Sequence, residues 1–224
     1  QKTINFNEQP QELYRYDHLY NCAGLFSDKI AHRFNIGLKY SLIPFKGIYW
    51  ELKDQTKFEI STNIYPVPDI DVPFLGVHFT PNADSSKVTI GPTATLALGR
   101  ENYNLLEKIE PKKTINNVSF IIRQYIQNKG GFRNYVHDQL PLAFEPFLIK
   151  SAQQLIPKIR LKDIKKSSKV GIRAQLYDFS KNSLQDDFLC ITENNSTHVL
   201  NAISPAFTAS FELADHIINL SHNV

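Results

Sequence analysis

The sequence of 224 residues predicts an α+β protein, in which an antiparallel sheet is flanked by helices. Between residues 42 and 100, strand-like runs alternate with turns that contain proline and glycine, a spacing typical of antiparallel strands. Residues 114–127 and 132–155 carry apolar side chains at helical spacing. The last segment, 204–220, opens with Ser-Pro, a pair that favours the start of a helix.

The first elements lead into a turn of small residues. Residues 11–21 (QELYRYDHLYN) predict β structure that runs into Cys22, Ala23 and Gly24. Ser27 and Asp28 then predict the N-cap of a short helix over 29–34. A strand therefore delivers the chain to a tight turn, and a helix begins there.

The central sheet is predicted from four runs, which are 47–53, 58–64, 75–80 and 87–93. The helical segment 132–155 follows Gly130 and Gly131, and its Pro141 and Pro146 are expected to kink or divide it. Two further strands are predicted at 170–176 and 188–192. The final helix is expected to have Ser204 as its N-cap and Pro205 at its first helical position.

The composition is that of a globular protein, with 42% hydrophobic and 21% charged residues, and it excludes a disordered or fibrous chain. A net charge of +3 is too weak to indicate a nucleic-acid partner. Most of the positive excess lies in residues 158–169. This basic stretch is either a solvated surface segment or a patch that faces an anionic partner, including peripheral contact with a membrane.

The two cysteines, Cys22 and Cys190, match no metal-binding spacing, and we expect both to be reduced and buried. Reduced thiols favour a cytoplasmic location, with membrane association through the basic stretch as an addition. No apolar run approaches about 18 residues, which predicts a soluble protein. The histidines show no metal-ligand spacing either, so we expect no metal site.

The common motifs for nucleotide binding and hydrolysis are absent from the sequence. It contains no GxGxxG, GxxxxGK[ST], GxSxG or HExxH pattern and no Cys/His cluster. Composition and spacing therefore lead only to a soluble domain of mixed α and β structure.

A series of short motifs resembles known flavoenzymes. Residues 21–28 (NCAGLFSD) look like the second flavin-contacting motif of FAD-dependent oxidoreductases of the D-amino-acid-oxidase type. Other stretches resemble the L-2-hydroxyglutarate oxidase/dehydrogenase family within that superfamily. They are 44–49 (PFKGIY), 65–69 (YPVPD), 73–80 (PFLGVHFT), 90–94 (IGPTA) with 100–103 (RENY), 171–175 (GIRAQ) with 186–188 (DDF), and 198–206 (HVLNAISPA) with 208–210 (TAS).

The resemblance implies FAD as the cofactor and a 2-hydroxy acid as the substrate. It also implies a division into a partial Rossmann-like FAD-binding domain at 1–37, a substrate domain at 38–166 and the C-terminal part of the FAD-binding domain at 167–224. Members of the family begin with a βαβ unit whose glycine-rich turn holds the FAD pyrophosphate. That motif is missing here, so we expect a C-terminal portion of such an enzyme that is inactive and binds FAD weakly by itself.

The flavin-contacting residues implied by the resemblance lie in two segments. The first contributes Cys22, Ala23, Gly24 and Ser27, where small residues let the backbone approach a flat cofactor. The second contributes Asn201, Ser204, Pro205 and Ala206, where a helix start would place its positive dipole beside the flavin. The alternatives are an ordinary strand-to-helix turn and an ordinary capped helix.

The substrate residues are expected in the predicted sheet. His78 is the candidate base for the substrate hydroxyl, and Arg173 is the candidate partner of the substrate carboxylate. Lys46, where the family usually has arginine, joins Tyr49 and Tyr65 as candidate walls of the pocket. The alternatives are a structural histidine and an edge-strand arginine that faces water.

Two other functions agree with the same motifs. A sister flavoenzyme that acts on another 2-hydroxy or 2-amino acid would share the flavin segments. A non-catalytic binding module would keep the sheet without the chemistry. The sequence leaves the electron acceptor open among oxygen, a quinone and another carrier.

Overall fold

The computed structural model describes residues 2–6, 9–54, 56–67, 76–83, 87–93, 95–104, 107–128, 133, 136–137 and 140–222. The chain forms two compact units. Unit 1 combines residues 1–43 with residues 174–224, and unit 2 is the continuous stretch 44–173. Two long strands, β4 (Tyr40–Leu52) and β8 (Ile164–Asp178), contain the points where the chain passes between the units.

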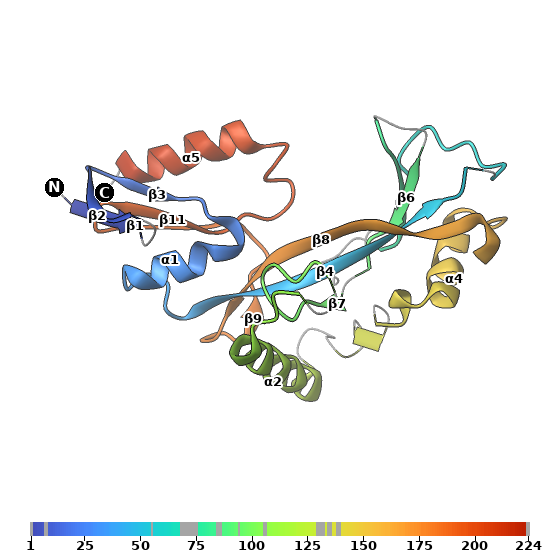
Figure 1. Ribbon diagram of the computed structural model, residues 1–224, viewed down its shortest axis with the longest axis horizontal. Helices are drawn as coiled ribbons and strands as arrows, with labels where there is room; N and C mark the ends of the chain where they lie inside the picture. Colours follow the sequence, from blue (N-terminus) through green and yellow to red (C-terminus); the bar gives the residue numbers. More distant parts are fainter. Residues whose placement is uncertain are drawn as a thin grey trace. The chain divides into compact units, whose positions relative to one another are not determined.

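Unit 1 is built around a three-stranded sheet with the order β10-β11-β3. Its strands are β3 (Leu19–Asn21), β10 (Leu189–Glu193) and β11 (Ser196–Asn201). β11 runs parallel to β3 and antiparallel to β10. Helices α1 (Ser27–Arg33) and α5 (Ser210–His222) lie on opposite sides of these strands, giving a layered α/β/α arrangement (Figure 1).

The remaining elements of unit 1 are short. A hairpin of β1 (Lys2–Phe6) and β2 (Gln9–Tyr16) opens the chain, and a 3₁₀ turn, η1 (Gly24–Phe26), precedes α1. The two-residue strand β9 (Ser183–Leu184) pairs with the end of β8. A small apolar cluster fixes α1 against the strands, because Ala31, Ile36 and Leu200 are almost completely buried in it.

Unit 2 contains an antiparallel sheet and several helical segments. Its strands β5 (His78–Pro81), β6 (Val88–Gly91) and β7 (Thr95–Leu96) join β4 and β8, with the order β5-β6-β4-β8-β9 and β7 paired to β4. The helical segments are α2 (Pro111–Gln127), η3 (Leu140–Ala143) and α4 (Glu145–Leu155), followed by the short turn η4 (Leu161–Asp163). Within the described residues, no helix combines the length and the apolar character needed to cross a bilayer.

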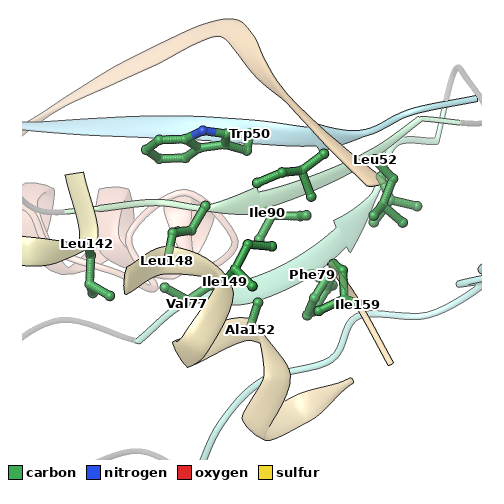
Figure 2. Packing of buried hydrophobic residues seen from close by; sticks show 12 residues of the cluster. Trp50, Leu52, Val77, Phe79, Ile90, Leu142, Leu148, Ile149, Ala152 and Ile159 are labelled. Carbon is green, nitrogen blue, oxygen red and sulfur yellow. The ribbon is translucent and has the colours of Figure 1, made fainter. Parts of the chain in front are cut away.

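The core of unit 2 forms where α4 covers one face of the sheet (Figure 2). Trp50, Phe79 and Ile90 come from three neighbouring strands, and Leu148 and Ala152 come from the facing side of α4. All five side chains are at most 2% exposed. Burial of such a set stabilises the unit through the removal of apolar surface from water, and it fixes which face of the sheet points away from the core.

The structure confirms the predicted mixture of antiparallel strands and helices. The strands near 11–21, 47–53, 87–93, 170–176 and 188–192 and the helix at 114–127 are present with shifted ends. Pro146 does not kink a helix, because it occupies the first turn of α4, where its missing N–H is not needed. The predicted glycine break at 130–131 and residue 75 of the predicted strand 75–80 lie outside the described residues.

Several element predictions are wrong, and one strand was missed. Residues 58–64 form no strand, and only Ile64 bridges to Phe79; the apolar residues there pack on the core cluster instead. The N-cap position of α1 is Phe26, and the side chain of Asp28 accepts a hydrogen bond from the Leu42 backbone N–H at 3.0 Å. β11 was not predicted as a strand, although all six of its residues are buried.

The final helix begins at Ser210, not at Ser204. Residues 204–209 form turns in which the Ala206 N–H donates to the Ile203 carbonyl at 2.7 Å and the Ala209 N–H donates to the Pro205 carbonyl at 3.0 Å. Because the Ala206 N–H is bonded within the turn and the helix begins only at Ser210, the helix dipole expected at Ser204 and Pro205 is absent there.

Candidate functional site

One face of the unit 2 sheet is polar, because side chains alternate along each strand. Trp50 pairs with Ile90 across β4 and β6, and both lie in the core cluster. The next positions along the two strands, Tyr49 and Gly91, therefore lie on the opposite face. His78 pairs with Gly91 across β5 and β6 and shares that face. Two predicted substrate residues, Tyr49 and His78, thus lie on the side of the sheet that α4 does not cover.

The imidazole of His78 is half-buried and held by the main chain. Its Nδ1 lies 3.0 Å from the carbonyl oxygen of Gly76, which can only accept a hydrogen bond. In the neutral ring, Nδ1 therefore carries the proton and Nε2 keeps a lone pair. Burial lowers the pKa of His78 from 6.5, the Gly76 hydrogen bond raises it, and the charges of Arg173 and Lys169 lower it further. The net lowering keeps this ring neutral and able to accept a proton near neutral pH.

Tyr65 stands beside this histidine. The two ring centroids are 4.6 Å apart, with planes inclined by 37°. Tyr65 is itself 45% exposed, so it covers one side of His78 while remaining open to solvent. The structure thus brings together Tyr65 and His78, two residues of the predicted substrate set.

Tyr49 is surrounded by basic side chains and glycines. The Nζ of Lys169 lies 4.9 Å from the centroid of the Tyr49 ring, within the range of a cation–π interaction. A Cβ at Gly171 would lie 4.0 Å from the ring, which shows that β8 passes close to Tyr49. Burial raises the pKa of the Tyr49 hydroxyl, and the charge of Arg173 lowers it in part. The hydroxyl therefore keeps its proton near neutral pH and can donate a hydrogen bond.

Arg173 is exposed, so burial gives no reason for an anionic partner. Its relevance comes from its position, because its charge acts on both His78 and Tyr49. Arg173, His78 and Tyr49 therefore form one polar group on unit 2.

Lys46 takes a different place in the sheet. It lies three residues before Tyr49 on β4, an odd spacing that reverses the side of a strand. Its Nζ is buried and donates to Asn102 Oδ1 at 2.9 Å, and burial lowers the pKa of this amine. Asn102 in turn donates to the carbonyls of Asn104 and Glu107, each at 2.7 Å. This lysine thus helps to fix the loop after β7.

The predicted flavin segments follow two adjacent parallel strands. Residues 22–26 leave the carboxyl end of β3, and residues 202–206 leave the carboxyl end of β11. Cys22, Gly24, Ser204 and Pro205 are exposed, while Ala23 and Ala206 are half-buried. In open α/β sheets, ligands bind outside the carboxyl ends of the parallel strands. Small exposed residues at this edge fit the close approach of a flat cofactor.

Buried hydrogen bonds fix the first of these turns, which follows β3. The Asn21 Nδ2 donates to the Ser27 carbonyl at 2.8 Å and to His198 Nδ1 at 2.9 Å. His198 Nε2 then donates to Ser196 Oγ at 3.0 Å. Burial lowers the pKa of His198, so this fully buried ring is neutral and acts as a structural link between β3 and β11.

The second turn is fixed by Asn201. Its Nδ2 donates to the carbonyls of Asp187 at 2.6 Å and Gln185 at 3.2 Å. The buried Asn201 Oδ1 and Ser27 Oγ have no hydrogen-bond partner among the described residues. Unpaired buried polar atoms are uncommon, and both belong to residues predicted to contact the cofactor.

Sequence reasoning missed several residues that shape these sites. Lys169 was treated only as part of the basic stretch, although the spacing of Lys169, Gly171 and Arg173 places all three on one side of a strand. Asn21 and His198 stood in the recognised motifs without a role. The two cysteines are free as predicted, but Cys22 is exposed rather than buried, because it begins the turn after β3. Residues 68–69, 73–75 and 94 of the motifs lie outside the described part of the chain.

The chain is similar in sequence to curated L-2-hydroxyglutarate dehydrogenases. L-2-hydroxyglutarate dehydrogenase of Caenorhabditis elegans is 35% identical over 210 residues, covering 92% of this chain and 47% of the relative. The human protein of the same name is 36% identical over 218 residues, covering 94% and 45%. The chain therefore spans about half the length of the curated relatives it matches.

A solved structure shares the fold. L-alpha-glycerophosphate oxidase from Mycoplasma pneumoniae, with FAD bound, superposes with a TM-score of 0.58 at 16% identity, covering 97% of this chain and 45% of the other. The family described as FAD dependent oxidoreductase matches residues 3–220, nearly the whole sequence. The layered sheet of unit 1, the antiparallel sheet of unit 2 and this match lead to one conclusion: the chain belongs to the DAO family of FAD-dependent oxidoreductases.

Proposed function

We propose that this chain is part of a flavoenzyme that oxidises L-2-hydroxyglutarate to 2-oxoglutarate. The similarity to relatives named L-2-hydroxyglutarate dehydrogenase, at 31–38% identity, carries the proposal. The polar face of unit 2 supports it, because a neutral histidine, a protonated tyrosine and an arginine are the groups that oxidation of a 2-hydroxy acid needs.

In this proposal, FAD is the cofactor, and Cys22, Ala23, Gly24, Ser27, Asn201, Ser204, Pro205 and Ala206 hold it. The exposed turns after β3 and β11 fit such a role, as do the unpaired Asn201 Oδ1 and Ser27 Oγ. When bound, FAD supplies the acceptor for the hydride that leaves C2 of the substrate.

The residues of unit 2 would prepare the substrate for that transfer. Arg173 binds the carboxylate next to C2, and His78 Nε2 accepts the proton of the C2 hydroxyl as the C2–H bond breaks and the carbonyl forms. The Gly76 carbonyl keeps the ring of His78 in the tautomer that this step requires. Tyr49 and Tyr65 line the pocket, and Tyr49 donates a hydrogen bond to a substrate oxygen. Lys46 supports the pocket indirectly, through its hydrogen bond to Asn102.

The test is anaerobic reduction of the FAD-loaded intact protein by L-2-hydroxyglutarate, followed as bleaching of the flavin absorption. We expect His78→Asn to slow bleaching by about 10²–10⁴-fold, because asparagine can still donate to the Gly76 carbonyl and lacks Nε2. His216→Asn, on the exposed side of α5, is the matched control. Bleaching by another hydroxy or amino acid alone would identify a sister enzyme, and no bleaching by any of them would identify a binding module.

We also propose a cytoplasmic location with peripheral membrane contact. The predicted cytoplasmic location rests on two free cysteines, while several relatives are named mitochondrial. Lys162 and Lys166 of the basic stretch are exposed, which supports the proposed peripheral contact with an anionic membrane surface. Vesicle co-sedimentation with and without anionic lipid tests this contact directly.

A further inference from the structure

Strand β8 carries two cations on the polar face of unit 2. Lys169 and Arg173 are four residues apart, and Gly171 lies midway between them on the same side of the strand. At about 3.3 Å per residue, their Cα atoms are roughly 13 Å apart. Gly171 has no side chain to fill the space between them, so two long basic side chains border an open strip of the sheet.

Both cations reach the same two residues. Lys169 Nζ lies over the Tyr49 ring at 4.9 Å, and the charge of Arg173 acts on the Tyr49 hydroxyl. The charges of Arg173 and Lys169 both act on His78, and Arg173 has the larger effect. The candidate base therefore lies within the field of two positive charges, with the arginine as the dominant neighbour.

Lys169 has no carboxylate partner among the described residues. Within the part of the chain that the structure describes, its ammonium contacts the Tyr49 ring and forms no ion pair with a carboxylate. Glu51 is a carboxylate on the same side of the sheet, and it accepts a hydrogen bond from the Ser167 hydroxyl at 2.5 Å. An unpaired cation beside a candidate base favours a second negative charge on the ligand.

We propose that Lys169 binds the carboxylate at C5 of the substrate while Arg173 binds the carboxylate at C1, so that this pair of cations selects dicarboxylic 2-hydroxy acids. The inference rests on the proposed function and adds a residue that determines specificity. Arg173 takes the C1 carboxylate because C2, with its hydroxyl, must lie against His78. Lys169, at the far end of the strip, is left for the distal carboxylate.

The test compares Lys169→Gln with Lys166→Gln in the FAD-loaded intact protein. Lys166 is an exposed lysine on the same strand, and its even position places it on the other side. We expect Lys169→Gln to raise KM for L-2-hydroxyglutarate by about tenfold or more, the size of one charge-assisted hydrogen bond. KM for L-2-hydroxypentanoate, which lacks the second carboxylate, should not change. Lys169→Arg should restore much of the lost affinity, and Lys166→Gln should behave like the wild type.

The outcomes separate the two proposals. If the wild type does not oxidise L-2-hydroxyglutarate, the proposed function fails. If the wild type does oxidise it and Lys169→Gln keeps the wild-type KM, the role of Lys169 fails alone. Equal changes for both substrates, or equal changes in Lys166→Gln, would also overturn it, because a general effect on structure or surface charge would then explain the data. Inhibition by 2-oxoglutarate gives a second measure, since the product keeps both carboxylates.

Discussion

His78 combines three features that a catalytic base needs, each with a separate physical origin. The Gly76 carbonyl fixes which nitrogen carries the proton. Burial and two nearby cations keep the ring neutral, because each disfavours the charged imidazolium. The ring of Tyr65 covers one side of it.

The cations beside His78 make the activity depend on pH in a defined direction. Because the pKa of His78 is lowered from 6.5, kcat/KM should rise with pH along an acidic limb whose midpoint lies below that value. Arg173→Gln removes a positive charge that disfavours imidazolium, so the pKa of His78 should rise and the limb should move to higher pH. The pH profile of kcat/KM for L-2-hydroxyglutarate measures this shift.

Lys166→Gln provides the control for that profile, since this lysine lies on the same strand and does not act on His78. A limb that stays in place in Arg173→Gln, or that moves equally in both variants, would contradict the assignment of His78 as the group that titrates.

At the scale of elements, side chains alternate between the two faces of the unit 2 sheet, so one face forms the hydrophobic core and the other carries the candidate site. One side of β4, β5 and β6 supplies Trp50, Phe79 and Ile90 to the core. The other side presents Tyr49 and His78, with Gly91 between them in the ladder. If the proposed site is correct, side-chain substitutions on the core face act mainly on folding, and substitutions of Tyr49 or His78 act mainly on binding and catalysis.

Gly91 is the position where this arrangement depends most on the absence of a side chain. Its φ is +132°, and a Cβ would lie 3.0 Å from the Ile48 carbonyl oxygen and 3.4 Å from the Tyr49 ring. Gly91→Ala should reduce the free energy of unfolding by about 1–3 kcal/mol and raise KM by displacing Tyr49. Urea denaturation and steady-state kinetics measure the two effects.

Gly171→Ala is the matched control, because its Cβ would meet the same ring at an ordinary contact distance of 4.0 Å. Equal effects of the two substitutions would show that the conformation of Gly91 has no special role.

The sequence predicted elements well where local pattern decides the structure. The alternation in β4 comes from burial of one face, and both this strand and the helix predicted at 114–127 are present. It failed at residues 204–209 and 58–64. Ser204 and Pro205 have the chemistry of a helix start, yet the Ile203 and Pro205 carbonyls accept turn hydrogen bonds and the helix begins at Ser210. Phe58, Ile60 and Ile64 are apolar because they cover the core, and periodicity cannot distinguish that from a strand.

The candidate site was predictable only through the resemblance to a family. His78, Tyr49, Tyr65 and Arg173 come from four separate segments, and no spacing rule relates them. The contact of Lys169 with Tyr49 depends on how β8 lies beside β4, which a single sequence does not reveal. The functions predicted for the ranges 1–37, 38–166 and 167–224, which are flavin binding and substrate binding, likewise stay predictions. The structure divides the chain into two compact units, so these functions can be tested one unit at a time.

At the scale of the whole molecule, the sequence lacks the glycine-rich motif that binds the FAD pyrophosphate in this family. We therefore expect the chain of 224 residues, expressed by itself and mixed with FAD, to lose the flavin on desalting. In the proposal, the turns after β3 and β11 would contact only part of such a cofactor, so they should not retain it. The absorption spectrum of the desalted protein measures the outcome.

The intact protein, carried through the same column, is the control and should keep its yellow colour. Retention of stoichiometric flavin by the chain alone would show that the two turns suffice, and the pyrophosphate site would then have to be sought within these 224 residues.

The parallel pairing of β3 with β11 also sets an order for events on the ribosome. β3 leaves the exit tunnel before unit 2, and its partner β11 leaves after unit 2. Unit 2 is continuous, so all its residues emerge before β11 does. Unit 2 can therefore fold during translation, while the nascent segment before it must wait, with one strand edge unpaired and exposed to chaperones or to aggregation. A chain that ended after residue 173 would contain all of unit 2 but carry a β3 with no β11 to pair with.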